Sequence, residues 1–127
     1  MNRIDLSDLF FATYEENGRG NGLFDCFGLF SEICRRRGIE LPPHPTPESL
    51  EDRQAAILAG AKDWKRLEAP EPWCGVAIRV GRYVAHMGVV LWDGTHFIHA
   101  NKKSGVTRSR LDEPAWAKRI YGYYRHE

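Results

Sequence analysis

The sequence predicts an α+β domain in which helices come first and an antiparallel sheet follows. Apolar residues recur at helical spacing within residues 26–37, whereas residues 76–80 and 83–92 show the pattern of strands. Two turn-forming pairs, Gly81-Arg82 and Asp93-Gly94, close the strand-like stretches. Helices followed by hairpin-linked strands in a chain of 127 residues are typical of an α+β protein.

The composition fits one globular domain over residues 1–127. Apolar residues make up 43% of the chain, and the net charge of +1 gives no reason to expect a nucleic-acid partner. No apolar run approaches the roughly 20 residues of a membrane-spanning helix, so no membrane insertion is expected. The three cysteines include no C-x-x-C pair, which argues against a disulfide framework or a four-cysteine zinc site.

The first patterned stretch is residues 4–14, whose spaced apolar residues predict a short helix. A Gly-rich turn at residues 17–22 follows, without the strand and the Lys-Ser/Thr ending of a phosphate-binding loop. We expect its glycines to let the backbone pass close to Cys26.

Residues 26–37 predict a helix with both ends marked. Asp25 suits the N-cap, the arginines at 35–37 suit the negative end of the helix dipole, and Gly38 suits the left-handed C′ position. Cys26 is then the first helical residue, where the helix dipole favours a thiolate and lowers the pKa of the thiol. A small apolar residue at the edge of a core would fit the same pattern.

A stiff connector over residues 41–45 leads to a second predicted helix over residues 46–67. Thr46 suits the N-cap of this helix and Pro47 its first position. Its apolar stripe consists of Leu50, Ile57, Ala61 and Trp64. His44 lies between prolines of the connector and is expected to be exposed.

Strand-like stretches fill the second half of the chain. They cover residues 76–80, 83–92, 97–100, 105–108 and 120–124, with a helical turn around Trp116. The Asp93-Gly94 turn places Val90 opposite Phe97 and Gly88 opposite His99.

This register brings two histidines together. His86 and His99 share one face as diagonal neighbours, roughly 7–8 Å apart at the backbone. A three-residue loop would place His99 on the other face. His96 points to that other face and is expected to be solvated.

A thiol at a helix start and two histidines on one sheet face supply the groups of a cysteine hydrolase. They are a nucleophile, a base and a polar residue that orients the base. Cys26, His86 and His99 would also suit zinc, but the C-x-x-C pair of zinc deaminases is absent. We therefore expect covalent catalysis with no metal and no cofactor. Cys34 is expected in the core, and Cys74 is given no role.

These motifs resemble those of the NlpC-type cysteine peptidases, a branch of the papain-like fold. The motif Asp-Cys-x-Gly-Leu occurs at residues 25–29, and His-x-Gly-aliphatic occurs at residues 86–89. The third polar residue lies within residues 97–100. In two departures, Cys74-Gly75 replaces the usual Gly-Asp, and Phe27 stands where Ser or Trp is frequent.

The resemblance implies roles for individual residues. Cys26 would attack a carbonyl carbon, His86 would act as the base, and His99 would orient His86. The Tyr14 hydroxyl, beside the thiol, and the Cys26 N–H would stabilise the oxyanion. Asp25, grouped with Tyr14 near the oxyanion and substrate, is expected to turn its carboxylate toward backbone N–H groups.

The resemblance also implies a substrate and a carrier. NlpC-type enzymes cleave peptidoglycan stem peptides, between D-glutamate and a diamino acid. The pattern at residues 18–26, the inserted helix and the ending at residues 116–124 resemble the branch carried by tailed bacteriophages. Residues 1–8 do not resemble a signal peptide.

We therefore expect a protein that is made in the host cytoplasm and carried in the virion. It would be held at the tail tip by tail-tip or baseplate proteins, and would act in the periplasm or cell wall. Two alternatives remain open: a structural tail component that no longer cleaves, and a secreted antibacterial amidase effector.

Overall fold

The computed structural model describes residues 4–127, and the chain divides into two compact units. Unit 1 comprises the residues up to Thr46 together with His99–Thr107, and unit 2 comprises Pro47–Ile98 and Arg108–Glu127. The single domain expected over residues 1–127 stays a prediction. Of the stretch at residues 1–8, residues 1–3 lie outside the described residues.

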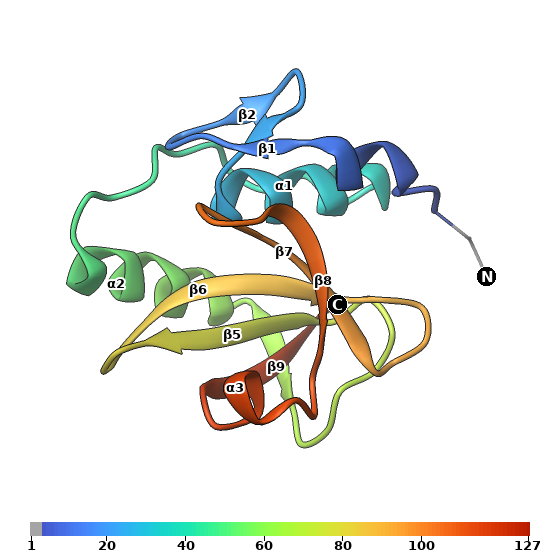
Figure 1. The fold of residues 1–127 in the computed structure, drawn as a ribbon. Coiled ribbons are helices and arrows are strands. Elements are labelled where there is room, and N and C mark those ends of the chain that lie inside the picture. Colours follow the sequence, from blue (N-terminus) through green and yellow to red (C-terminus); the bar gives the residue numbers. More distant parts are fainter. Residues whose placement is uncertain (1–3) are drawn as a thin grey trace. The chain divides into compact units, whose positions relative to one another are not determined.

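Unit 1 begins with a short helix and a small sheet (Figure 1). Its first elements are the 3-10 helix η1 (Ser7–Phe11) and strands β1 (Thr13–Tyr14), β2 (Arg19–Gly20) and β3 (Leu23–Phe24), and the sheet order is β1-β3-β2. The helix predicted over residues 4–14 is therefore wrong in extent. Thr13 and Glu15 donate backbone hydrogen bonds to Gly22 and Phe24, and this pairing outweighs the helical pattern.

Helix α1 (Cys26–Arg36) confirms the predicted helix and both of its ends. The Asp25 side chain accepts a hydrogen bond from the Gly28 N–H at the N-terminus. Beyond the C-cap, Gly38 adopts a φ of 82°. The Gly38 and Ile39 N–H groups donate to the carbonyls of Arg35 and Cys34, as in a Schellman motif.

Two glycines let the Gly-rich turn pass against the first turn of α1. A Cβ atom on Gly28 would lie 1.9 Å from the Gly18 carbonyl oxygen, and one on Gly18 would lie 2.5 Å from the Leu23 carbonyl oxygen. No side chain fits at these distances, so the close approach to the start of α1 expected from the sequence is confirmed.

Unit 2 contains most of the main sheet. Its elements are α2 (Leu50–Ala61), β4 (Trp64–Leu67), β5 (Gly75–Val80), β6 (Tyr83–Val90), α3 (Pro114–Ala117) and β9 (Ile120–His126). Strands β7 (His96–Asn101) and β8 (Gly105–Arg110) cross between the units, and the strand order is β4-β9-β5-β6-β7-β8.

The inserted helix is shorter than the 46–67 predicted. It begins after Ser49, whose side chain caps the Asp52 N–H, and ends at Ala61. Trp64 belongs to β4 and pairs with His126 of β9, so strand pairing ends the helix. Thr46 is not the cap, because its side chain bonds to residues of unit 1 instead.

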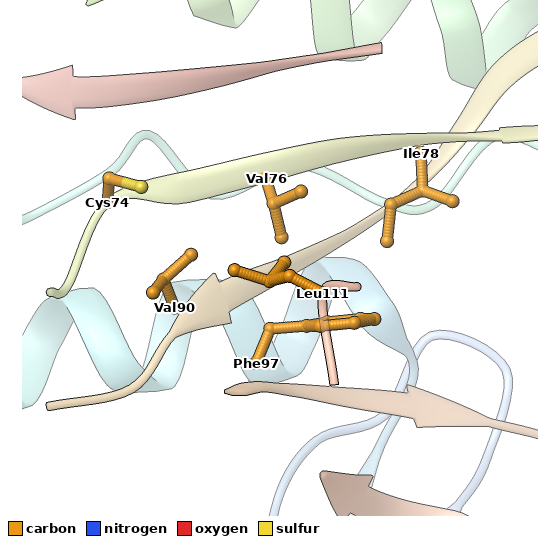
Figure 2. Close-up of a cluster of buried hydrophobic side chains, with 6 residues drawn as sticks. All are labelled: Cys74, Val76, Ile78, Val90, Phe97 and Leu111. Atoms are coloured by element: carbon orange, nitrogen blue, oxygen red, sulfur yellow. The ribbon is translucent and has the colours of Figure 1, made fainter. Parts of the chain in front are cut away.

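The core of unit 2 lies on one face of the main sheet (Figure 2). Its buried side chains are Cys74, Val76, Ile78, Val90, Phe97 and Leu111. Val76 and Ile78 alternate along β5 with residues that face the other way, as the sequence predicts. Within residues 4–127, no helix has the length and apolar character that crossing a membrane requires.

The hairpin of β6 and β7 has the predicted register. Val90 pairs with Phe97, and Val89 pairs with Ile98. Asp93 organises the turn by accepting hydrogen bonds from the N–H groups of Thr95 and His96. Burial alone would raise the pKa of Asp93, but these hydrogen bonds and the His96 ring lower it to about 2. His96 is therefore not simply solvated, because its ring pairs with Asp93 at 2.6 Å.

Candidate active site

Cys26 is the first residue of α1 and is 6% exposed. The Leu29 N–H donates the first helical hydrogen bond to the Asp25 carbonyl. The thiol therefore lies at the N-terminus of a helix of 11 residues, where the helix dipole favours a negative charge. This placement is the one that the sequence predicts for a nucleophile.

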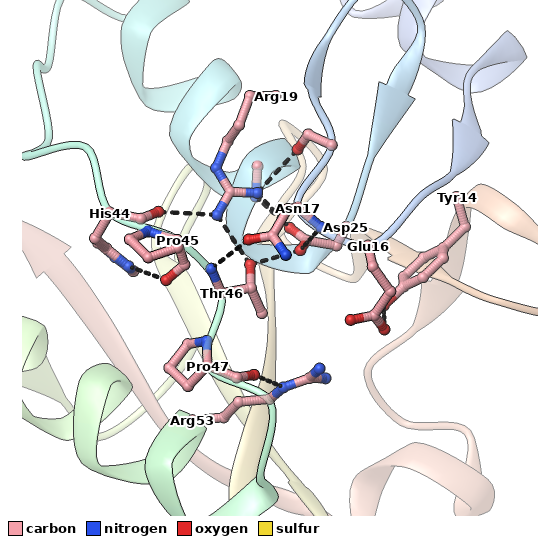
Figure 3. Close-up of polar contacts among 12 residues, drawn as sticks. Tyr14, Glu16, Asn17, Arg19, Asp25, His44, Pro45, Thr46, Pro47 and Arg53 are labelled. Carbon is pink, nitrogen blue, oxygen red and sulfur yellow. Dashed lines mark hydrogen bonds and ion pairs between the residues drawn. The ribbon is translucent and has the colours of Figure 1, made fainter.

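The carboxylate of Asp25 lies buried beneath this helix start (Figure 3). One oxygen accepts from the Gly28 N–H at 2.9 Å and from Arg19 at 2.9 Å. The other accepts from the Asn17 N–H at 2.8 Å and from the Thr46 hydroxyl at 2.5 Å. The expected turn of Asp25 toward backbone N–H groups is confirmed, and Asp25 is 1% exposed.

Arg19 and Thr46 fasten the connector to this site. Arg19 donates to the His44 carbonyl at 3.0 Å and to the Thr46 hydroxyl at 2.9 Å. The Thr46 N–H donates to the Asn17 side chain at 2.7 Å. His44 is exposed, as expected, and its ring meets that of Phe27 edge-on at 5.5 Å. Sequence reasoning missed these partners, because side-chain hydrogen bonds across long sequence separations have no periodic signal.

Tyr14 lies in the electrostatic environment of Cys26. Its hydroxyl donates to Glu16 at 3.1 Å. Burial, this hydrogen bond and the negative charges of Glu16, Cys26 and Asp25 raise the pKa of Tyr14 to about 12. The phenol stays protonated at neutral pH and can act as a donor, but its single proton must leave Glu16 to reach a ligand. The oxyanion role of Tyr14 stays a prediction.

His86 lies on β6 in unit 2, beside a β-bulge. Ile78 pairs with His86, but the next pair is Arg79 with Val84, so Ala85 is the extra residue. Bulges re-aim neighbouring side chains and are frequent beside active sites. The Val84 N–H next to the bulge donates to Gln54 of α2 at 2.8 Å, so the inserted helix supports the strand that carries His86.

Trp116 of α3 is the aromatic partner of His86. The two rings stack with centroids 6.2 Å apart and an interplanar angle of 29°. Trp116 also meets Phe97 edge-on at 5.5 Å, and the Arg119 guanidinium lies 4.7 Å from the centre of its ring. The sequence predicts the helical turn around Trp116 but not this contact with the candidate base.

His99 is fully buried and belongs to unit 1, one residue beyond the last pair of the β6–β7 hairpin. The confirmed register supports the shared face of His86 and His99. Because the two histidines belong to different units, their proximity stays a prediction, as does the proximity of Cys26 to His86.

The other two cysteines lie in apolar surroundings. Cys34 and Cys74 are each 2% exposed. Burial raises the pKa of Cys34 to about 12 and also raises the pKa of Cys74. The core position expected of Cys34 is confirmed. Among residues 4–127, no group of three or more His, Cys, Asp or Glu side chains is arranged to hold a metal ion.

A cavity of about 590 Å³ lies in unit 1 beside the start of α1. Its walls include Phe27, Gly28 and Ser31 of the helix, Arg19 of β2 and residues 39–45 of the connector. This volume is in the range of small-ligand sites. Phe27 and Gly28 directly follow the candidate nucleophile along the chain.

Comparison of the chain with known proteins identifies its family. Residues 12–125 match the family described as NlpC/P60. The chain belongs to the NlpC/P60 family. Members of the NlpC/P60 family are in general cysteine peptidases or amidases that act on cell-wall peptides. No protein with a curated description matches the chain significantly.

Two solved structures show the NlpC/P60 fold. One is an NLP/P60-family protein from Staphylococcus aureus, described as similar to lipoprotein, with a TM-score of 0.67 and 21% identity over 94% of this chain. The other is NlpC1 from Trichomonas vaginalis, with a TM-score of 0.72 and 18% identity over 95% of this chain. The matches span only 38% and 41% of those chains. The predicted papain-like α+β fold is confirmed.

Proposed function

We propose that this NlpC/P60 chain is a cysteine peptidase that cleaves an amide bond in peptidoglycan stem peptides, between D-glutamate and a diamino acid. One observation carries the proposal: Cys26 opens α1 above a fully satisfied Asp25 cap, within a chain matched to the family over residues 12–125.

The reaction needs only groups of this chain and water. The Cys26 thiolate attacks the carbonyl carbon, and the oxyanion accepts hydrogen bonds from the Cys26 N–H and from Tyr14. The C–N bond breaks as His86 gives its proton to the leaving amine. Water, deprotonated by His86, then attacks the thioester, which releases the acid and restores the thiol. His99 orients His86 in this scheme.

Delivery by a phage particle is the second part of the proposal. The sequence pattern at residues 18–26 supports it, and so does the inserted segment, whose helical part is α2. In this scheme tail-tip or baseplate proteins hold the chain, and the tail carries it to the cell wall. Proteomics of purified virions tests this part, and particles that never contain the chain would contradict it.

Digestion of purified sacculi tests the chemistry. We expect the intact chain to release fragments whose masses, read by mass spectrometry, identify cleavage after D-glutamate. The Cys26→Ala chain should release none, while its folding is unchanged because only a small buried group is removed. The matched control is Cys34→Ala, which also removes a buried thiol and should keep full turnover. Folded intact chain without turnover would favour the structural tail component.

A further inference from the structure

Arginines of this protein are held in two different ways. Arg19 and Arg36 bind carboxylates of Asp25 and Asp8 in unit 1. In unit 2, where other arginines also pair with carboxylates, the guanidinium groups of Arg66 and Arg79 lie on aromatic rings instead. This second arrangement leaves charge available for a ligand.

Arg66 is a residue of the edge strand β4. Arg66 pairs with Tyr124 across β4 and β9, and Trp64 pairs with His126 two residues along. Alternation puts these side chains on one face of the sheet. Arg66 lies 4.7 Å from the centre of the Tyr121 ring and 5.7 Å from that of Tyr124.

Arg79 of β5 lies 5.2 Å from the centre of the same Tyr121 ring. The two guanidinium groups are therefore within about 10 Å of each other, which is the Debye length at roughly 0.1 M salt. Among residues 4–127, neither group lies within ion-pair distance of a carboxylate. We call Arg66, Arg79, Tyr121 and Tyr124 the Arg–Tyr face.

Contacts within the chain hold the side chains of the Arg–Tyr face in place. Arg66 donates to the Tyr121 carbonyl at 2.7 Å. A Cβ atom on Gly122 would lie 3.0 Å from the Arg66 guanidinium, so the glycine leaves room for this side chain. Arg66 is nevertheless exposed, and the rings of Tyr121 and Tyr124 are half-buried.

We propose that the Arg–Tyr face is a second binding site, for the carboxylate-bearing glycan–peptide polymer of the cell wall. The class of ligand rests on the proposed function; the face itself does not. Guanidinium groups match the fork geometry of carboxylates, and the tyrosine rings hold the two guanidinium groups at the surface. The net charge of the chain is only +1, so attraction to the polymer depends on this local concentration of charge.

Retention on purified sacculi tests the proposal. The chain carries Cys26→Ala throughout, so that the sacculi stay intact. We expect Arg66→Gln/Arg79→Gln to weaken retention about tenfold at low salt. The control is Arg108→Gln/Arg110→Gln, which removes two exposed arginines from β8 at the opposite edge of the sheet. Both doubles lower the net charge by the same amount, and the control should bind as the parent does.

Equal loss of retention in the two double variants, or no loss in either, would overturn the proposal. So would a difference that persists after the wall carboxylates are capped with a neutral amine. With Cys26 restored, Arg66→Gln/Arg79→Gln should cleave a soluble stem peptide at the parent rate. A parent chain that binds sacculi through the Arg–Tyr face but cleaves no substrate would contradict the proposed function alone.

Discussion

Cys26 in unit 1 and His86 in unit 2 are held by different kinds of interaction. The helix start at Cys26 depends on Asp25, whose two oxygens accept four hydrogen bonds. His86 depends on the Trp116 ring and on a bulge in its strand. Charged and hydrogen-bonded groups therefore hold the nucleophile in position, whereas ring stacking and the bulge in its strand hold the base.

Because of this contrast, the two units should respond to different kinds of mutation. A change of charge without a change of volume should disturb unit 1 and leave unit 2 intact. Loss of an aromatic ring should do the reverse. Variants of both kinds can break or sharpen the comparison.

The largest effect is expected at Asp25. Asp25→Ala leaves Arg19, Thr46 and two backbone N–H groups without their acceptor in a buried place. We expect the free energy of unfolding to fall by about 3 kcal/mol, measured by urea denaturation. Asp25→Asn keeps an oxygen for the cap and should lose less. A loss below about 1 kcal/mol for Asp25→Ala would show that the network does not hold unit 1.

Trp116 gives the corresponding test in unit 2. Trp116→Ala removes the ring that contacts His86, Phe97 and Arg119, and we expect a loss of about 2 kcal/mol, because the ring is only half-buried. Trp116→Phe keeps a stacking ring and should retain most of the stability. Steady-state kinetics on a stem peptide should show a lower kcat for the alanine variant. Unchanged kcat would mean that stacking does not position the base.

Much of this arrangement could be predicted from the sequence. Periodic apolar residues and turn pairs determine α1 and the register of Val90 with Phe97, and both are confirmed. Long-range side-chain partners could not be predicted. Thr46 follows the same helix-capping rule as Ser49, yet Asp25 and Arg19 bind Thr46 instead. Only the folded chain decides between such local and distant partners.

A smaller effect is expected when the charge of Arg19 is removed. Its guanidinium lies 2.9 Å from the Asp25 carboxylate, one residue before Cys26. Arg19→Gln leaves that negative charge uncompensated, so the pH of half-maximal iodoacetamide labelling of Cys26 should rise by about one unit. Other charged or titratable groups of this corner are Tyr14, Glu16, Lys102 and His44. They are unchanged by the mutation.

Thr46→Val is the control for Arg19→Gln. It removes a hydroxyl that donates to Asp25 but changes no charge. We expect it to lower stability by about 1 kcal/mol and to shift the labelling pH much less. Equal shifts in the two variants would mean that the network acts only through structure.

The smallest effect is expected at His99. If His99 orients His86 and transfers no proton, His99→Asn should keep several-fold more activity than His99→Ala, since the amide preserves a hydrogen-bonding group at this fully buried position. Stem-peptide turnover at neutral pH measures the difference. Equal activity in the two variants would contradict this role.

The most direct test of the account is the order in which the three thiols react in the folded protein. Iodoacetamide labelling at pH 6, mapped by mass spectrometry, should modify Cys26 first, because the helix dipole favours its thiolate. Burial raises the pKa of Cys34 to about 12 and also raises that of Cys74, so both should stay protonated and unmodified. Faster labelling of Cys34 or Cys74 than of Cys26 would contradict the assignment of the nucleophile.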